Sequence, residues 1–380
     1  MNSQERVLTA LNHQRPDRPP RDLGSTTATG IHPLAYQALK KHLGLDDGFE
    51  YLSSRALLAR VEQPVIDHLG IDLLPIISSA SAEVPELDEN RTYVDRWGVE
   101  RRLPEGNGHY LVSSPPLAGM STTTELAEHS WPEPREDFSE LTQQARQLRE
   151  TTDKALVLNL EVGFLHQAQF MRGFDHWLMD LAGDPTFAEN YMDRILEIWL
   201  AEAEAMVEAV NGLADVVIYA DDIAFQNGTM VSADMYQRYF KPRQKKVFDL
   251  MTGSRMKSLY HSCGSLGSLL GELVDMGIDA LNPVQVSAKG MDDTRALKEQ
   301  WGEEITFWGG VDTHYVLPRG TVEEVEAEVR RRLNDLAVDG GYVLASVHDI
   351  QPEVPPQNIL AMFRAADNWS DEQQKEELER

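Results

Sequence analysis

Residues 155–163 read Ala155-Leu156-Val157-Leu158-Asn159-Leu160-Glu161-Val162-Gly163, and a helical pattern follows from Phe164 to Ala182. The continuous apolar run over 155–158 is typical of a strand buried on both faces, as strands are in a parallel sheet covered by helices. A short turn that contains glycine then leads into the helix. The stretch therefore predicts one strand–helix unit of a parallel α/β fold.

The same unit recurs along the rest of the chain. Buried strands are expected at residues 155–160, 216–219, 256–260, 280–284, 305–308 and 341–347, with two earlier strands near 22–30 and 71–77. Eight alternating units predict a (β/α)8 TIM barrel, an α/β fold, as a single domain over residues 1–370. A doubly wound open sheet is the alternative, but no glycine-rich dinucleotide fingerprint follows any expected strand.

Three segments lie outside this repeat. Residues 4–12 have the pattern of a short amphipathic helix and predict an N-terminal helical extension. Residues 91–102 and 109–117 resemble paired antiparallel strands around a Pro- and Gly-rich turn, which predicts a β-hairpin insertion at about 91–117. The closing helix is expected at 356–368, followed by an acidic, frayed tail at 371–380.

The composition narrows the classes of function. The formal net charge of −27 over 380 residues argues against nucleic acid and against anionic membrane surfaces, because both attract basic proteins. No apolar run approaches the roughly 18–20 residues of a membrane span, and the N-terminus lacks a signal-peptide pattern. Cys263 is the single cysteine, which excludes an internal disulfide framework and fits a reducing cytoplasm.

That cysteine belongs to a short motif at the tip of the expected strand 256–260, where the chain reads Tyr260-His261-Ser262-Cys263-Gly264. Side chains alternate along extended backbone, so His261 and Cys263 point the same way. An imidazole and a thiolate are good zinc ligands. The pair alone is a weak signal, because a lone cysteine is also a small buried hydrophobic residue.

Polar side chains end most of the other expected strands. They are Glu161, Asp221, Asp222, Asn282, Gln285, Asp312 and His348. A TIM barrel aims its strand ends into one mouth, so this distribution favours a site there. We expect His261, Cys263 and His348 to hold zinc with one position open. Glu161 or Asp222 is expected as fourth ligand or as acid or base, and a backbone-bonded His348 is the alternative.

Several short motifs are shared with a known superfamily. They are Arg172-Gly173-Phe174, Leu178-Met179-Asp180-Leu181, Asp221-Asp222 with Gln226-Asn227-Gly228, His261-Ser262-Cys263-Gly264-Ser265, Asn282-Pro283-Val284-Gln285, Trp308-Gly309-Gly310-Val311-Asp312-Thr313, His348-Asp349-Ile350-Gln351 and Val354-Pro355-Pro356-Gln357-Asn358-Ile359. Together they resemble the uroporphyrinogen decarboxylase superfamily over about residues 4–368. The resemblance implies a (β/α)8 barrel.

Two signatures of the true decarboxylases are missing. Those enzymes carry an Arg-Gln-Ala-Gly-Arg motif near the N-terminus that grips substrate carboxylates, and an early aspartate that faces the pyrrole nitrogens. Here the two places read Arg21-Asp22-Leu23-Gly24-Ser25-Thr26 and Ile76-Ile77-Ser78-Ser79-Ala80. A mouth lined by carboxylates would also repel a substrate that has many of them, unless arginines offset the charge. Porphyrin decarboxylation is therefore not expected.

The chain resembles more closely the zinc-dependent methyltransferases of the superfamily that act with corrinoid proteins, such as the methylcobamide:coenzyme M methyltransferases. In the coenzyme M enzymes, a His-x-Cys pair and a cysteine near the last strand hold the zinc. His261 and Cys263 match the pair, but His348 stands in place of the last cysteine. An imidazole there still suits zinc, makes the metal more electrophilic, and puts coenzyme M specificity in doubt.

The resemblance thus implies a cytoplasmic, zinc-dependent methyltransferase that moves a methyl group between a small methylated substrate and a corrinoid. The corrinoid would be cobalamin or a separate corrinoid protein, since no corrinoid module follows the barrel; a homodimer is compatible with this reading. The expected catalytic residues are Glu161, Asp222 and His348. The residues expected to position the substrate are Asp221, Asn282, Gln285 and Asp312.

Two rival hypotheses stay open. The first is a metal-free decarboxylase or other lyase of the uroporphyrinogen decarboxylase type, in which His348 and Asp222 form an acid–base pair. The second belongs to another class, a protein that binds a corrinoid or another ligand without turnover. Metal content separates the first rival from the zinc hypothesis, and the absence of methyl transfer would favour the second.

Overall fold

A sheet of parallel strands forms the centre of the molecule. The computed structural model describes residues 1–105, 109–160 and 162–379. Within these residues, seven parallel strands are hydrogen-bonded in the order β14-β13-β12-β11-β8-β7-β3. They are β3 (Leu73–Ile76), β7 (Ala155–Asn159), β8 (Val216–Ala220), β11 (Lys257–His261), β12 (Ala280–Asn282), β13 (Thr306–Trp308) and β14 (Tyr342–Val343). Every residue of β7 is buried, as its apolar run predicts.

The two edges of this sheet are joined by the chain around Arg21. The amide of Leu344, just after β14, donates to the Pro20 carbonyl at 2.9 Å, and the amide of Asp22 donates back to the Leu344 carbonyl at 2.9 Å. On the other side, the amide of Asp72 donates to the Arg21 carbonyl at 2.9 Å, just before β3. The predicted TIM barrel is confirmed, with this segment in place of a regular eighth strand.

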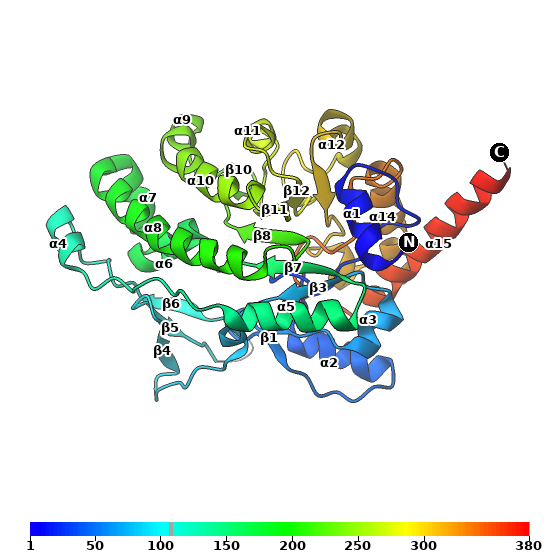
Figure 1. The fold of residues 1–380 in the computed structure, drawn as a ribbon, viewed down its shortest axis with the longest axis horizontal. Coiled ribbons are helices and arrows are strands. Elements are labelled where there is room, and N and C mark those ends of the chain that lie inside the picture. Colours follow the sequence, from blue (N-terminus) through cyan, green and yellow to red (C-terminus); the bar gives the residue numbers. More distant parts are fainter. Residues whose placement is uncertain (106–108, 161, 380) are drawn as a thin grey trace.

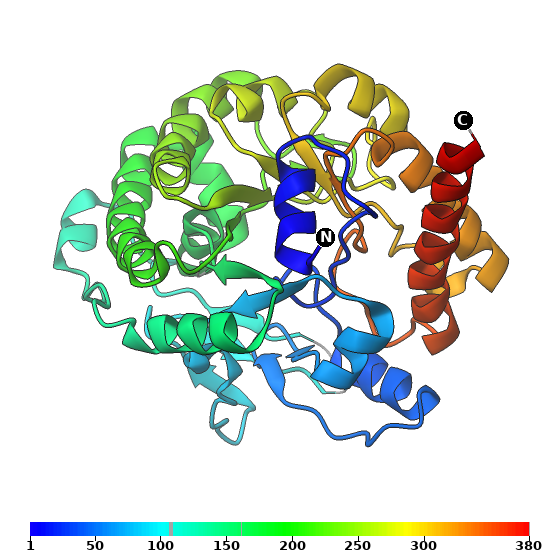
Figure 2. The same ribbon diagram turned by 45° about the vertical axis from the view of Figure 1, so that its right-hand side comes forward.

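Helices surround the sheet and connect its strands (Figures 1 and 2). They are α2 (Pro33–His42), α3 (Gln63–Leu69), α5 (Ser139–Thr151), α6 (Phe164–Arg172), α7 (Phe174–Gly183), α8 (Pro185–Val210), α10 (Lys241–Thr252), α11 (Leu270–Asp275), α12 (Thr294–Trp301), α14 (Val322–Leu336) and α15 (Pro356–Glu379). The helix expected at 164–182 is two helices, because Gly173 between them has φ 86°, which no helix accommodates.

Short elements complete the connections. They are β1 (Tyr51–Ser53), β2 (Leu58–Ala59), η1 (Ser79–Ala82), α4 (Thr123–Glu128), β9 (Ala224–Phe225), β10 (Gly228–Thr229), α9 (Ala233–Met235), the π-helix η2 (Tyr236–Phe240) and α13 (Val316–Arg319). None of the described helices is both long enough and apolar enough to cross a membrane.

The N-terminal helix α1 (Ser3–Leu11) closes one end of the barrel. Val7 and Leu11 are fully or almost fully buried in one cluster with inward-facing strand residues such as Val157 and Leu259. In Figure 2, α1 lies across the centre of the ring of strands. The amide of Gln4 donates to the Asp153 carbonyl, immediately before β7, at 2.8 Å. Since α1 covers the ends where strands begin, the opposite ends are left for a site.

The predicted hairpin insertion is a three-stranded antiparallel sheet formed by β4 (Thr92–Val94), β5 (Glu100–Arg102) and β6 (Leu111–Ser114). The segment expected as one strand folds back at Asp95, whose carboxylate accepts the amides of Trp97 and Val99 at 3.0 and 3.1 Å. Arg101 contacts the barrel, with its guanidinium 4.5 Å from the Phe170 ring centroid. Gly106, Asn107 and Gly108 of the expected turn lie outside the described residues.

The acidic tail differs from the expectation. Helix α15 continues to Glu379, beyond the helix end expected at residue 368. Arg330 of α14 forms an ion pair with Glu372, with Nη2 3.1 Å from Oε1. This contact, together with a run of Glu, Gln and Lys residues that favour helix, extends the element beyond the predicted end.

Candidate metal centre and the cavity beside it

The candidate ligands come from the ends of two strands, β11 and β14, between which β12 and β13 lie in the sheet. His261 is the last residue of β11 and is in register with Ala220 at the end of β8 and with Asn282 at the end of β12. Cys263 follows two residues later, and His348 lies in the connection after β14. One potential ligand atom from each of His261, Cys263 and His348 lies within 4.8 Å of the others. Whether the three hold zinc stays a prediction.

The orientation of His261 is fixed by a hydrogen-bonded chain. The amide nitrogen of Asn282 donates to the Trp308 carbonyl at 3.1 Å, so its oxygen is the atom that meets His261 Nδ1 at 2.6 Å. Nδ1 therefore carries the proton, and Nε2 presents its lone pair 3.7 Å from Cys263 Sγ. Burial lowers the pKa of His261 to about 4, so the ring is neutral, the form that binds metals.

Cys263 has an environment that disfavours an isolated thiolate. Burial and the nearby Asp222 carboxylate raise the pKa of the Cys263 thiol well above its usual value. The Cys263 amide donates to Asp222 Oδ1 at 2.7 Å, which fixes the backbone that carries the sulfur. A bound cation would offset the unfavourable charge of the thiolate, since metals deprotonate the thiols that ligate them. The donor set therefore fits zinc.

His348 is more accessible than His261. Its side chain is 44% exposed, against 6% for His261, and the two ring centroids are 5.5 Å apart. His348 Nδ1 contacts the Asp349 carboxylate, which leaves Nε2 as the ring nitrogen for a metal. Burial opposes the charged ring, but Asp349 outweighs it and raises the pKa of His348. The alternative of a His348 side chain bonded to backbone is not what the structure has; its Nδ1 contact is to a side chain.

His166, which lies in α6, is not among the site residues that the sequence predicts. Its Nδ1 is 2.9 Å from Asp221 Oδ1 and its Nε2 is 3.7 Å from Asp222 Oδ2. Burial opposes the imidazolium, but the hydrogen bonds to Asp221 and Asp222 raise the pKa of His166 to about 10. His166 holds the pKa of Asp222 well below its usual range, although burial alone would raise it. The available signal was the position of His166 in the first turn after a barrel strand.

Asp221 anchors the start of α6. Its carboxylate is fully buried and accepts the amides of Leu165 and His166 at 2.9 and 2.8 Å, as well as the Tyr219 hydroxyl. A carboxylate at a helix N-terminus is stabilised by these unpaired amides. Asp221 thus places His166 beside the cavity and is itself covered by protein.

The remaining predicted residues serve the surrounding loops. Gln285 accepts the Gly264 amide at 2.6 Å and donates to Gln226 at 3.0 Å. Asp312 accepts the amides of His314, Tyr315 and Val316 at 2.9, 3.1 and 3.3 Å. Among the described cavity-lining residues, neither Gln285 nor Asp312 is present. Glu161 lies outside the described residues, so its predicted catalytic role stays a prediction.

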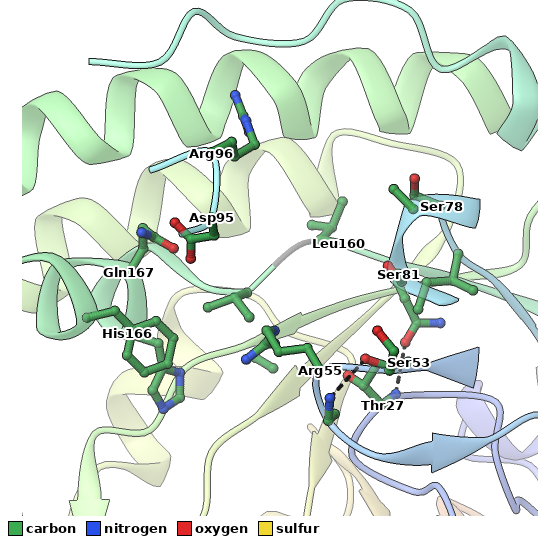
Figure 3. Close-up of a pocket in the computed structure, with 18 of the residues that line it drawn as sticks. Thr27, Ser53, Arg55, Ser78, Ser81, Asp95, Arg96, Leu160, His166 and Gln167 are labelled. Atoms are coloured by element: carbon green, nitrogen blue, oxygen red, sulfur yellow. Dashed lines mark hydrogen bonds between the residues drawn. The ribbon is translucent and has the colours of Figure 1, made fainter. Parts of the chain in front are cut away.

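A cavity of about 840 Å³ opens beside His261, Cys263 and His348. Its wall includes His261, His348, Asp222 and His166, the polar side chains of Thr27, Ser53, Ser78 and Asn159, the aromatic rings of Tyr93, Phe170 and Trp199, and Arg55, Arg96, Arg101 and Arg135. Figure 3 shows Arg55 extending from the β1–β2 connection into this cavity, toward the side on which His166 lies. The three-stranded insertion supplies one wall through β4, β5 and the turn between them.

Comparisons with known proteins agree with this architecture. A family model described as uroporphyrinogen decarboxylase (URO-D) matches residues 2–369. Methylcobamide:CoM methyltransferase MtaA of Methanosarcina barkeri is 25% identical over 182 residues, which are 48% of this chain and 49% of that protein. The match thus spans about half the length of this curated relative.

Two further likenesses cover almost the whole chain. A uroporphyrinogen decarboxylase of Bacillus cytotoxicus is 21% identical over 380 residues, 98% of each protein. The solved structure of a methyltransferase from Methanosarcina mazei has 21% sequence identity and a TM-score of 0.66, and the match covers 97% of this chain and 99% of that one. At this identity, the structural likeness shows the fold.

Proposed function

The chain belongs to the uroporphyrinogen decarboxylase family, and we propose that it is a zinc-dependent methyltransferase that exchanges a methyl group between a small substrate and a corrinoid. The observation that carries the proposal is the convergence of His261, Cys263 and His348 within 4.8 Å. The methyltransferase relative supports the same class of reaction. We place the protein in the cytoplasm, because a reducing compartment keeps the single thiol of Cys263 available.

The chain's own residues prepare the ligand atoms. Asn282 turns His261 Nε2 toward Cys263, and Asp222 accepts the backbone amide of Cys263. Asp349 contacts Nδ1 of His348. Such hydrogen bonds to ligands orient them and raise their basicity. When bound by this set, zinc supplies a Lewis acid that polarises a substrate heteroatom or stabilises a thiolate. The corrinoid, when present, supplies the cobalt that exchanges the methyl group.

Proton exchange is assigned to the cavity wall beside His261. When a methyl group leaves a heteroatom, the electron pair of the broken bond stays on that atom, which then takes up one proton. His166 and Asp222 lie in this wall with their polar atoms 3.7 Å apart. We assign the proton exchange to this pair, with Glu161 as a further candidate. The aromatic and polar walls of the 840 Å³ cavity would position the rest of the substrate.

Metal content tests the proposal directly. Protein produced without a metal-binding tag should contain roughly one zinc per chain by elemental analysis. Cys263→Ala should lose the zinc and keep its far-UV circular dichroism, whereas His42→Ala, at an exposed histidine of α2, should keep both. Zinc-loaded protein should demethylate methylcobalamin in the presence of a small thiol, amine or alcohol. The proposal would be contradicted if wild-type protein contained no zinc and did not differ from Cys263→Ala in the demethylation of methylcobalamin.

A second candidate rests on the decarboxylase relative, whose match covers 98% of both chains. In this candidate, His348 and Asp222 act as an acid–base pair without metal. Release of CO2 from a small carboxylic acid by zinc-free protein, abolished in His348→Ala and in Asp222→Asn, would support it. Zinc-dependent consumption of methylcobalamin without CO2 release would reject it.

A further inference from the structure

His348 separates two cavities. It lines the 840 Å³ cavity together with His261, and it also lines a second groove of about 600 Å³ together with Tyr315, Arg319 and Gln351. Its exposed fraction of 44% is consistent with access from more than one direction. A transfer reaction has two reactants, and the structure offers each of them a separate approach to the same histidine.

The groove contains a flat aromatic surface with a cation beside it. Tyr315 is 62% exposed, although its backbone amide is tied to Asp312 at 3.1 Å, so the ring is held on a fixed loop. The Arg319 guanidinium lies 5.9 Å from the Tyr315 ring centroid. The His314 ring meets Tyr315 at 6.1 Å, and its Nδ1 is 3.1 Å from the Ser287 hydroxyl. An exposed ring held in this way costs little further ordering when it packs on a flat ligand.

We propose that this groove is the binding site for the corrinoid, while the larger cavity takes the small substrate. The inference rests on the methyltransferase function proposed above. A corrinoid has a flat ring edged by amide groups and, in its nucleotide loop, a phosphodiester. Tyr315 and His314 would contact the ring, Gln351 and Thr313 would meet the amides, and Arg319 would meet the phosphodiester.

The shape of the site also suits a corrinoid better than a small substrate. The groove is bordered by an exposed ring and is open to solvent, so a ligand there keeps part of its surface outside. A small methylated compound gains most of its affinity from being surrounded, which the larger cavity provides through Tyr93, Phe170 and Trp199. A corrinoid can lie across the groove, free or held by a carrier protein, and still face His348.

Titration with hydroxocobalamin tests the assignment, with tryptophan fluorescence and the cobalamin absorbance as readouts. Tyr315→Ala and Arg319→Ala should each raise the Kd by roughly five- to tenfold, the loss expected for one aromatic or one charged contact. Phe225→Ala, at an exposed ring of β9, and Arg295→Ala, at an exposed arginine of α12, should leave the Kd unchanged. Zinc content should be the same in all four variants.

Each outcome separates the two proposals. If wild-type protein binds cobalamin and the Kd is unchanged in Tyr315→Ala and Arg319→Ala, the groove is not the corrinoid site. The proposed methyltransferase function would not be affected by this result. A second titration uses cobalamin bound to a corrinoid-carrying domain. If Tyr315→Ala and Arg319→Ala lose affinity only in this second titration, the groove binds the corrinoid that is held by a carrier protein. Wild-type protein that binds cobalamin in neither titration would contradict both the groove and the methyltransferase proposal.

Discussion

His261 Nδ1 lies 2.6 Å from Asn282 Oδ1, and the Asn282 amide nitrogen donates to the Trp308 carbonyl. The two residues are neighbours in register on β11 and β12, so the barrel itself sets this pair. Because the Trp308 carbonyl can only accept, it fixes which end of the Asn282 amide faces the imidazole. The chain thus leaves Nε2 of His261 as the ring nitrogen that is available to a metal.

Removing this hydrogen bond should weaken metal binding without removing a ligand. Asn282→Ala leaves His261 Nδ1 without its acceptor, and we expect the affinity for zinc to fall by about 10- to 100-fold. Competition with a chromophoric chelator measures the effect. Asn282→Asp keeps an acceptor and should retain more of the affinity. Equal affinities in wild type and Asn282→Ala would show that the orientation of His261 has no part in metal binding.

The third ligand can be tested by exchange as well as by deletion. His348→Ala should weaken zinc binding by at least about 100-fold, because it removes a ligand rather than a supporting group. His348→Cys places a thiolate at the third position and should restore most of the affinity. Elemental analysis would measure the zinc content of each variant. The spectra of the cobalt(II)-substituted proteins would report the number of thiolate ligands. Full zinc binding by His348→Ala would assign the third position to another group, and Asp222, whose Oδ1 lies 4.0 Å from His261 Nε2, would be tested next.

The barrel could be predicted from the repeat of strand–helix units along the sequence. The proximity of His261, Cys263 and His348 could be predicted from their positions at the ends of expected strands. Buried runs such as residues 155–160 predict parallel strands, and strand ends share one mouth, so the proximity of His261 and His348 follows from the fold. The resemblance drawn from the motifs is confirmed by the family match over residues 2–369. That these residues hold zinc stays a prediction, because proximity is not occupancy.

The parts that could not be predicted depend on partners that sequence spacing does not reveal. His166 is placed by Asp221, a carboxylate 55 residues away that accepts its backbone amide. Asn282 was expected to contact substrate, but its buried amide is used between His261 and Trp308. The extra strand of the insertion arises from one turn at Asp95, whose side chain satisfies two amides locally.

The pKa of His166 predicts a pH dependence of stability. The pKa is raised to about 10 in the folded protein, against about 6.5 when unfolded. The stabilisation is therefore fully present below pH 6.5 or so, declines as the pH rises, and is lost once the pH passes about 10. The difference in the free energy of unfolding between wild type and His166→Gln should shrink over this interval. Urea titrations at several pH values measure it.

A matched variant separates this effect from a general loss of stability at high pH. His42→Gln changes an exposed histidine of α2 and reports the general effect of replacing a histidine under the same conditions. Direct titration of the His166 ring by NMR should give a midpoint near 10. A midpoint near 6.5 would show that Asp221 and Asp222 do not hold the proton on His166.

The insertion is anchored to the barrel by a buried carboxylate, Glu202 of α8. Glu202 Oε2 is 2.9 Å from Arg96 Nη1 and 3.2 Å from Arg135 Nη2, and its Oε1 accepts the Arg135 amide at 3.0 Å. The Glu202 side chain is 4% exposed, whereas both arginines are 32% exposed. Removing the carboxylate would leave two cations and one amide without this partner at the cavity wall.

Glu202→Ala should therefore lower the free energy of unfolding by about 1–3 kcal/mol, the cost of unsatisfied, partly buried donors. Glu197→Ala, on the same helix but 70% exposed and paired with Arg194, should change the free energy of unfolding by less than about 0.5 kcal/mol. Limited proteolysis should also cut Glu202→Ala faster between Thr92 and Ser114, because the turn at Arg96 loses its attachment to α8. Equal unfolding curves and equal cleavage rates for the two variants would mean that other contacts, such as Arg101 on Phe170, hold the insertion in place.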